Sequence, residues 1–350
     1  MRITRSVRRL EAYTPGEQPA SRRVVKLNTN ENPYPPSPAC AEILRRFDLD
    51  RLRRYPDPVF SGLRSALAAM CGTTPERIFV GNGSDEVLSV AAKTFVEDDE
   101  AIGSLDPSYS LYKTLAAIRD VKWVGVPPPA GAADAPSLAP KLARRNVSLF
   151  LWTNPNAPTG AFAGPETVAA FAKAFPGVVI VDEAYADFAR TNCMRLATGA
   201  ADRNVIVMRT FSKSYSLAGL RVGWCVGPED LIAAMYKVKD SYNVDAIAQA
   251  VALAAVRDQA WMRANVAKVV KTRTRFVREL ESRGWDVIPS ESNFVFAKPP
   301  APAEAAKIFE ELRARNIFVR YFKGPKTGDR LRITIGTDRQ MKALLAALDG

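Results

Sequence analysis

The segment VVIVDEAY, residues Val178–Tyr185, is where the fold can first be inferred. Four consecutive apolar β-branched residues predict a strand covered on both faces, because a strand with one solvent-exposed face alternates apolar and polar residues. The strand ends at Asp182, whose carboxylate is costly to bury without a cation or a hydrogen-bond donor beside it. The protonated ring nitrogen of a cofactor and a structural arginine would both meet that need.

Similar short apolar runs lie on both sides of this strand, separated by segments such as Glu166–Ala174 that have the pattern of a crossover helix. This alternation predicts an α/β fold around a mostly parallel, seven-stranded sheet. The segment Pro127–Pro140 is expected to be a surface connection. The other six expected strands are Ile78–Val80, Ala101–Ser104, Lys122–Val126, Ser148–Thr153, Val205–Arg209 and Val222–Val226.

From Trp261 onward the pattern changes to that of a smaller α+β domain, beginning with a long charged helix at Trp261–Arg283. Far upstream, the proline-rich arm Asn28–Pro38 cannot be a regular helix or a central strand. We expect an N-terminal arm and part of the small domain in residues 1–44, a large domain in 45–260 and the small domain in 261–350. In the small domain we expect strands at Trp285–Ile288, Asn293–Ala297, Ile317–Arg320 and Leu331–Ile335, and a helix at Ala303–Arg315.

The composition excludes several kinds of function. The 350 residues include no histidine, which removes the common Ser-His-Asp and Cys-His catalytic systems, and the four cysteines lack metal-ligand spacing, so we expect no metal. The 49 Lys and Arg residues exceed the 37 Asp and Glu residues by 12, but they are spread along the chain, so we expect no nucleic-acid partner. No apolar run is long enough to span a membrane, and the basic start lacks the apolar core of a secretory signal, so we expect a cytoplasmic protein.

Three further motifs follow predicted strands, at the edge where open parallel sheets bind ligands. Taken singly, each has an ordinary interpretation: a turn capped by Ser84 or Asp85, a loop, and a surface lysine at Lys213. The motifs are GNGSDE at Gly81–Glu86, NPNAPTG at Asn154–Gly160 and RTFSKSYSLAGLR at Arg209–Arg221.

Together with DEAY, these motifs predict a site for pyridoxal phosphate. A glycine-rich turn before a helix suits a phosphate, and a buried carboxylate followed by a tyrosine suits the ring nitrogen and the phenolic oxygen. Lys213 suits the cofactor aldehyde, and an arginine follows it eight residues later.

With these motifs in this order, the chain resembles the fold-type I pyridoxal-phosphate aminotransferases, specifically the histidinol-phosphate aminotransferase family. The resemblance runs over nearly the whole chain, and the segments LNTNENPYPPSP (Leu27–Pro38), DSYNVDAIAQ (Asp240–Gln249) and LRITIGT (Leu331–Thr337) point most narrowly to that family. It implies reversible amino transfer between L-histidinol phosphate and 2-oxoglutarate, giving imidazole-acetol phosphate and glutamate, in histidine biosynthesis. An aromatic or broad-range aminotransferase of the same fold is the alternative.

The resemblance also implies roles for individual residues at the cofactor. Lys213 would bind the aldehyde, and Asp182 would keep the ring nitrogen protonated. Tyr185 and Asn156 would hydrogen-bond the phenolic oxygen, and Tyr109 would stack on the ring. The phosphate would be held by Gly83, Ser84, Asp85, Ser212 and Arg221 and, in a homodimer with shared active sites, by a partner residue corresponding to Tyr55.

Substrate recognition is assigned by the same resemblance to the small domain and the arm. Arg332 would bind the carboxylate of glutamate and, with Arg320, the phosphate of histidinol phosphate, because a planar guanidinium suits both anions. The other residues near the substrate would be Tyr13, Asn30 and Asn293. One departure from the family is Ala157, which stands where a second asparagine is frequent, so the asparagine contact to the cofactor would have to come from Asn156.

Overall fold

The computed structural model describes residues 3, 7, 8, 10, 17–19, 24–199 and 203–349. Its largest element is a seven-stranded sheet in the order β2-β8-β7-β6-β5-β3-β4, which confirms the expected α/β fold. Within this sheet β8 runs antiparallel to both neighbours, and the other pairs are parallel. The strands are β2 (Ile78–Gly81), β3 (Ala101–Leu105), β4 (Lys122–Val126), β5 (Val147–Thr153), β6 (Val178–Asp182), β7 (Val205–Thr210) and β8 (Gly223–Val226).

Helices cover both faces of this sheet, because alternate strand residues point to opposite faces and both sets are apolar. Leu149 and Leu151 pack with α4 (Ser84–Phe95), α5 (Leu111–Ile118) and α9 (Glu229–Val238). Phe150 and Trp152 belong to the core on the other face. That face is covered by α3 (Ser61–Cys71), α6 (Leu138–Ala143), α7 (Pro165–Ala174), α8 (Met194–Thr198) and α10 (Ala246–Arg257).

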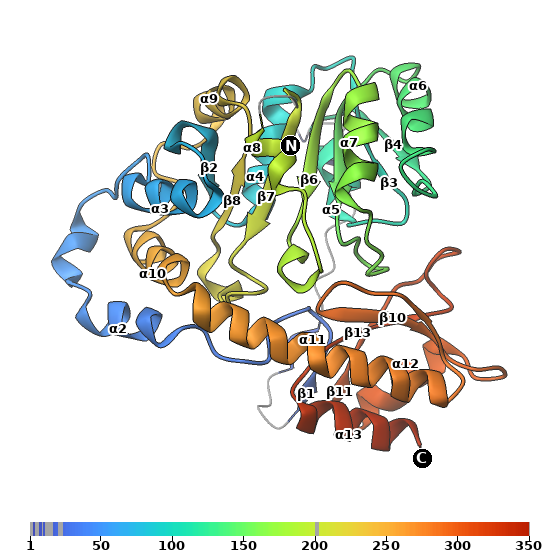
Figure 1. Cartoon of the computed structure of the whole chain (residues 1–350). Coiled ribbons are helices and arrows are strands. Elements are labelled where there is room, and N and C mark those ends of the chain that lie inside the picture. The colour runs from blue at the N-terminus through green and yellow to red at the C-terminus, as the bar shows by residue number, and fades with distance from the viewer. Residues whose placement is uncertain are drawn as a thin grey trace.

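A smaller four-stranded antiparallel sheet, in the order β12-β13-β10-β9, lies below the large sheet in Figure 1. The long helix α11 (Gln259–Ser282) extends from α10 across this smaller sheet. The arm divides between the two units: β1 (Val25–Lys26) pairs with β11 (Ile317–Phe318), whereas α2 (Pro38–Arg46) packs on α10. The remaining elements are β9 (Asp286–Ile288), β10 (Phe294–Lys298), α12 (Ala305–Ala314), β12 (Arg320–Tyr321), β13 (Leu331–Thr334) and α13 (Asp338–Leu348).

Two local expectations are wrong. The single strand expected at Ile317–Arg320 is divided at Val319, because β11 pairs in parallel with β1 while β12 joins β13 in the four-stranded sheet. The segment Pro127–Pro140 is not only a surface connection, since Ala135 and Leu138 are buried in the core on the face of the large sheet that carries Phe150, and α6 begins within the segment. Apolar residues among the prolines anchor that segment.

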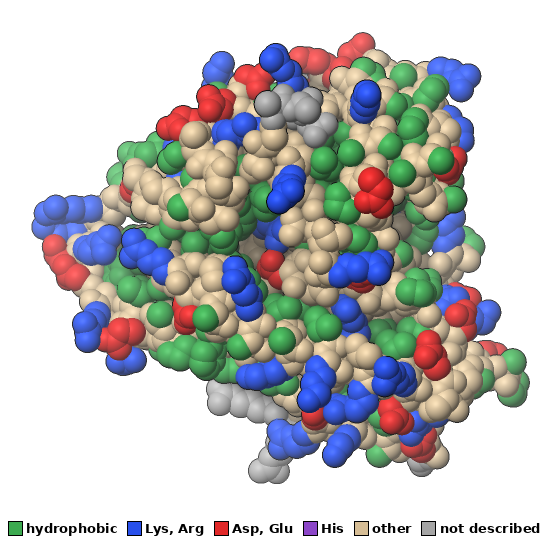
Figure 2. All heavy atoms as spheres, viewed as in Figure 1, with side chains coloured by type: hydrophobic (Ala, Val, Ile, Leu, Met, Phe, Trp, Pro, Cys, Tyr) green, Lys and Arg blue, Asp and Glu red, His purple; other side chains and the backbone are tan. Residues whose placement is uncertain are grey.

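The surface carries no concentrated basic patch on the face shown in Figure 2, where Lys and Arg side chains are dispersed among acidic, polar and apolar ones. Within the described ranges, no helix is long and apolar enough to cross a membrane. The same residues contain no group of three or more His, Cys, Asp or Glu side chains arranged to hold a metal ion.

Candidate active site

A cavity of about 560 Å³ lies where the carboxyl ends of β5, β6 and β7 meet the arm and the smaller sheet. This is the position expected for ligands in open α/β sheets. Thr153, Asp182 and Thr210 line it from those strand ends. The predicted site residues that line it are Asn30, Ser84, Asp85, Tyr109, Asp182, Tyr185, Ser212, Lys213, Arg221, Arg320 and Arg332.

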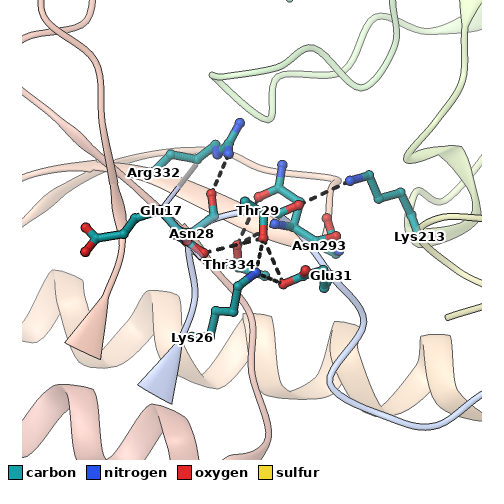
Figure 3. A network of polar contacts seen from close by, with 10 residues as sticks. Glu17, Lys26, Asn28, Thr29, Glu31, Lys213, Asn293, Arg332 and Thr334 are labelled. Carbon is teal, nitrogen blue, oxygen red and sulfur yellow. Dashed lines mark hydrogen bonds and ion pairs between the residues drawn. The ribbon is translucent and has the colours of Figure 1, made fainter. Parts of the chain in front are cut away.

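Lys213 points from the large domain toward the arm (Figure 3). Its Nζ donates a hydrogen bond to the Thr29 carbonyl oxygen at 3.2 Å and lies 5.7 Å from the centre of the Tyr185 ring. The arm also holds the backbone of this lysine, because Asn32 Nδ2 donates to the Lys213 carbonyl at 3.1 Å. Asn30 Nδ2 donates to the Tyr185 hydroxyl at 3.0 Å. The arm residues therefore position both Lys213 and Tyr185. Nothing in the sequence predicted that the Thr29 carbonyl would contact Lys213.

Asp182 is buried at the end of β6, with 4% of its surface exposed. Its carboxylate accepts hydrogen bonds from the Tyr112 hydroxyl at 2.8 Å and from the Ala184 N–H at 3.1 Å. Burial raises the pKa of Asp182 to about 6, because the charged form is poorly solvated there. The buried arginine of this region, Arg209, binds Glu183 and Asp187 instead. The sequence left two partners open for Asp182, a cofactor ring nitrogen and a structural arginine. Among the described residues, no arginine is paired with Asp182.

Gly83 and Arg221 lie against each other at the beginning of α4. The backbone at Gly83 has φ +83°, and a Cβ there would lie 2.6 Å from Nη2 of Arg221. Arg221 Nη2 also lies 3.3 Å from a carboxylate oxygen of Asp85. The expected side-chain cap is wrong: Gly83 is the N-cap, and neither Ser84 nor Asp85 caps the helix through its side chain. The helix thus presents its positive dipole end and an arginine to the cavity.

These groups fit pyridoxal phosphate. Lys213 offers an amine for the aldehyde, and Asp182 is a buried carboxylate that a protonated ring nitrogen would pair. Because Gly83 has no side chain, Arg221 can lie directly against the beginning of α4, where backbone N–H groups and a guanidinium together suit a phosphate.

Another wall of the cavity comes from the smaller sheet and the loop within it. Arg320 of β12 and Arg332 of β13 are direct cross-strand partners, and each guanidinium carbon lies 5.2 Å from the centre of the Phe322 ring. Arg332 Nη2 donates to the Asn28 carbonyl at 2.8 Å (Figure 3). Lys323 and Lys326 also line the cavity. We did not predict these two lysines, although their segment KGPKTGDR separates the strands that carry the two arginines.

Asn156 is not among the cavity-lining residues. Its Nδ2 donates to the Pro107 carbonyl at 3.0 Å and to Thr159 at 2.9 Å, and its Oδ1 accepts from Ser108 at 2.9 Å. Because the amide is fully used in bracing these loops, we correct the expectation that it binds the phenolic oxygen. Ala157, the next residue, lines the cavity instead.

Two other predicted residues, Asn293 and Tyr55, do not line the cavity. Asn293 is completely buried behind the cavity, where its Nδ2 donates to the Asn30 carbonyl at 2.9 Å, so it supports a lining residue. Tyr55 is 79% exposed and stacks on Tyr242, with 4.3 Å between ring centres. Tyr13 lies outside the described residues. Conversely, Tyr112, the second tyrosine of the DPSYSLY motif, was not predicted to touch Asp182.

A larger cavity, of about 1070 Å³, is lined by residues of α11 and of the chain after β6. Its buried charges are already paired, since Arg209 binds Glu183 at 2.8 Å and Asp187 at 2.7 Å. We therefore place the candidate active site in the smaller cavity, where no arginine of the described residues pairs with the buried Asp182.

Comparisons with known proteins show the family. The family model for aminotransferase class I and II matches residues 22–348. Histidinol-phosphate aminotransferase 1 of Burkholderia pseudomallei is 44% identical over 349 residues, covering 98% of this chain and 96% of the relative, and its counterpart from Nostoc is 41% identical over 344 residues, covering 98% and 96%. The crystal structure of histidinol-phosphate aminotransferase from Sinorhizobium meliloti in complex with pyridoxal-5'-phosphate has a TM-score of 0.88 at 28% identity, covering 99% of this chain and 96% of that one. The chain belongs to the aminotransferase class I and II family, and within it is similar to histidinol-phosphate aminotransferases along nearly its whole length.

Proposed function

We propose that this protein catalyses reversible amino transfer between L-histidinol phosphate and 2-oxoglutarate, giving imidazole-acetol phosphate and glutamate, in histidine biosynthesis. One observation carries the proposal: a single cavity contains the Lys213 amine, the buried Asp182 and the paired arginines Arg320 and Arg332. The names of the similar proteins support the same substrate.

When bound, pyridoxal phosphate supplies an aldehyde that takes up the amino group and a ring that withdraws electrons from the reacting carbon. Lys213 would hold the aldehyde and move the proton at the substrate Cα, since the chain has no histidine to serve as the base. The Thr29 carbonyl, 3.2 Å from its Nζ, would orient that amine. Asp182 would keep the ring nitrogen protonated, and Tyr185 would hydrogen-bond the phenolic oxygen.

The remaining residues would bind anions and orient the rings. Tyr109 would lie against the cofactor ring. Arg320 and Arg332 would bind the phosphate of histidinol phosphate in one half of the reaction and a carboxylate of glutamate in the other. Asn30 would contact the substrate directly, and Asn293 would hold Asn30 in place through the hydrogen bond to its carbonyl. The cofactor phosphate would be held by Gly83, Ser84, Asp85, Ser212 and Arg221.

We also propose a cytoplasmic homodimer with shared active sites. The exposed stack of Tyr55 on Tyr242 is accompanied by exposed apolar side chains at Leu49, Leu52 and Val59, which a second copy would cover. In that dimer Tyr55 of the partner subunit would reach the cofactor phosphate. Light scattering of the purified protein tests the dimer, and a monomer would contradict it.

A half-reaction experiment tests the substrate. The cofactor-loaded protein is mixed separately with L-histidinol phosphate, L-phenylalanine and L-arginine, and the absorption band of the lysine-bound cofactor is followed. We expect rapid loss of the band with L-histidinol phosphate alone. Faster loss with L-phenylalanine would support the broad-range alternative. As the control, Lys213→Ala should reduce transamination by about 10⁴-fold or more, because it removes both the attachment point and the proton carrier.

A further inference from the structure

The hairpin that joins β12 to β13 is an ordered bridge between the two units of the molecule. Its turn is closed by the Gly328 N–H, which donates to the Gly324 carbonyl at 2.8 Å. Its base is anchored to the smaller sheet, where Arg330 Nη1 donates to the Asp286 carbonyl at 2.9 Å. The hairpin, residues 322–330, is therefore a defined structural unit that extends from the strands carrying Arg320 and Arg332.

The tip of this hairpin reaches the large domain. Lys326 Nζ donates to a carboxylate oxygen of Asp106 at 2.7 Å, although 220 residues separate the two in sequence. Asp106 directly follows β3, and its N–H donates to the Val126 carbonyl at 2.8 Å, so its backbone continues the pairing of β3 with β4 in the large sheet. Both Asp106 and Lys326 line the cavity. Their ion pair thus joins the two walls between which the substrate would lie.

The start of the same hairpin touches the two arginines. Phe322 lies 5.2 Å from the guanidinium carbons of both Arg320 and Arg332, measured to its ring centre. A movement of the hairpin away from Asp106 would therefore move the aromatic surface on which both guanidinium groups rest. This connection links a contact at the cavity wall to the geometry of the anion-binding pair.

We propose that the Lys326–Asp106 ion pair is a positioning contact that holds the 322–330 hairpin across the cavity and so sets Arg320 and Arg332 for the anionic group of the substrate. The proposal rests on the proposed function. The Lys326 side chain is 56% exposed and that of Asp106 is 24% exposed. An ion pair this accessible to water is weak, so the bridge can open for substrate exchange and close again.

Two variants and one mild protease test the contact. Asp106→Asn and Lys326→Gln should each raise the KM for L-histidinol phosphate about fivefold, and the double variant should raise it no further. We expect kcat to change less than about twofold and the Kd for pyridoxal phosphate to stay the same. Trypsin is the second readout, because Asp106→Asn keeps Lys323, Lys326 and Arg330 as cleavage sites. Cleavage within the hairpin of the cofactor-loaded variant should be about fivefold faster.

The matched control is Asp98→Asn, which removes an exposed ion pair with Arg119 on the large domain and should change neither readout. If Lys326→Gln raises KM but Asp106→Asn does not, the Asp106 carboxylate does not position the hairpin and the proposal is refuted. Unchanged trypsin cleavage in Asp106→Asn also refutes it. If L-histidinol phosphate is not a substrate but cleavage accelerates, the proposed function fails while the hairpin contact stands.

Discussion

Asp182 and Glu183 are adjacent at the end of β6, and both are almost completely buried, yet their surroundings differ. Glu183 accepts from Arg209 Nε at 2.8 Å and also from the Cys193 N–H. Among the described residues, Asp182 accepts hydrogen bonds from the Tyr112 hydroxyl and the Ala184 N–H, and it lines the smaller cavity. One carboxylate is neutralised by the protein itself, whereas the other has its charge left for a ligand.

This difference separates structural charge from functional charge. A buried ion pair that has its hydrogen bonds made holds two segments together, and removing one partner leaves the other charge unpaired. A buried carboxylate without a cation is destabilising until something positive binds beside it. We therefore expect a substitution at Asp182 to lower activity, and one at Glu183 to lower stability.

The largest expected effect is on catalysis at Asp182. Asp182→Asn keeps the shape of the side chain but cannot hold a ring nitrogen in its protonated form, so we expect kcat/KM to fall about 10⁴-fold. Steady-state transamination measures the loss. The folded fraction should be checked by circular dichroism. An Asn variant within tenfold of the parent would contradict the assignment of this carboxylate to the cofactor ring.

Glu183→Gln is expected to act on stability instead. Arg209 would lose one of its two carboxylate partners in a buried site and keep only Asp187, which should lower the free energy of unfolding by about 3–4 kcal/mol. Urea unfolding of the cofactor-free protein gives this value. The folded variant should retain kcat within about threefold. A large loss of kcat at unchanged stability would remove the distinction between the two carboxylates.

The difference between the surroundings of Asp182 and Glu183 could be predicted from the sequence only in part. The seven strands of the large sheet, and Lys213, Asp182 and Tyr185 near its strand ends, could be predicted because apolar runs and motif order are local properties. Which carboxylate of the DEAY motif takes the arginine could not, because Arg209 is 26 residues away from Glu183 and the pairing depends on strand register. Similarly, Asn156 faces its own loops rather than the cavity, which only the loop geometry decides.

The pH dependence of stability is the next test. In the cofactor-free protein the pKa of Asp182 is raised from 3.8 to about 6 by burial, so the native state binds a proton more tightly than the unfolded chain. The contribution of this group therefore falls as the pH rises from about 4 to above 6, by up to about 3 kcal/mol. Relative to the parent, cofactor-free Asp182→Asn should gain up to that amount at pH 8 and almost nothing at pH 4. Urea unfolding at both values measures it, and a variant less stable than the parent at pH 8 would contradict the argument.

The smallest expected effect is at Tyr112, whose hydroxyl donates to Asp182 at 2.8 Å and favours the charged carboxylate. Tyr112→Phe removes that donor, so the pKa of Asp182 should rise further and the Kd for pyridoxal phosphate should increase about tenfold near pH 7, as expected for a hydrogen bond to a charged group. In a plot of cofactor affinity against pH, the fall in affinity at low pH should move to higher pH. The carboxylate must lose its proton before it can pair with the ring nitrogen, and in the variant it loses that proton at a higher pH. Tyr215→Phe is the matched control, since its hydroxyl accepts from Gln259 beside the larger cavity at 2.8 Å. It should leave the profile in place, and a shift in both variants would mean that burial of a tyrosine, rather than contact with the unpaired carboxylate, governs cofactor binding.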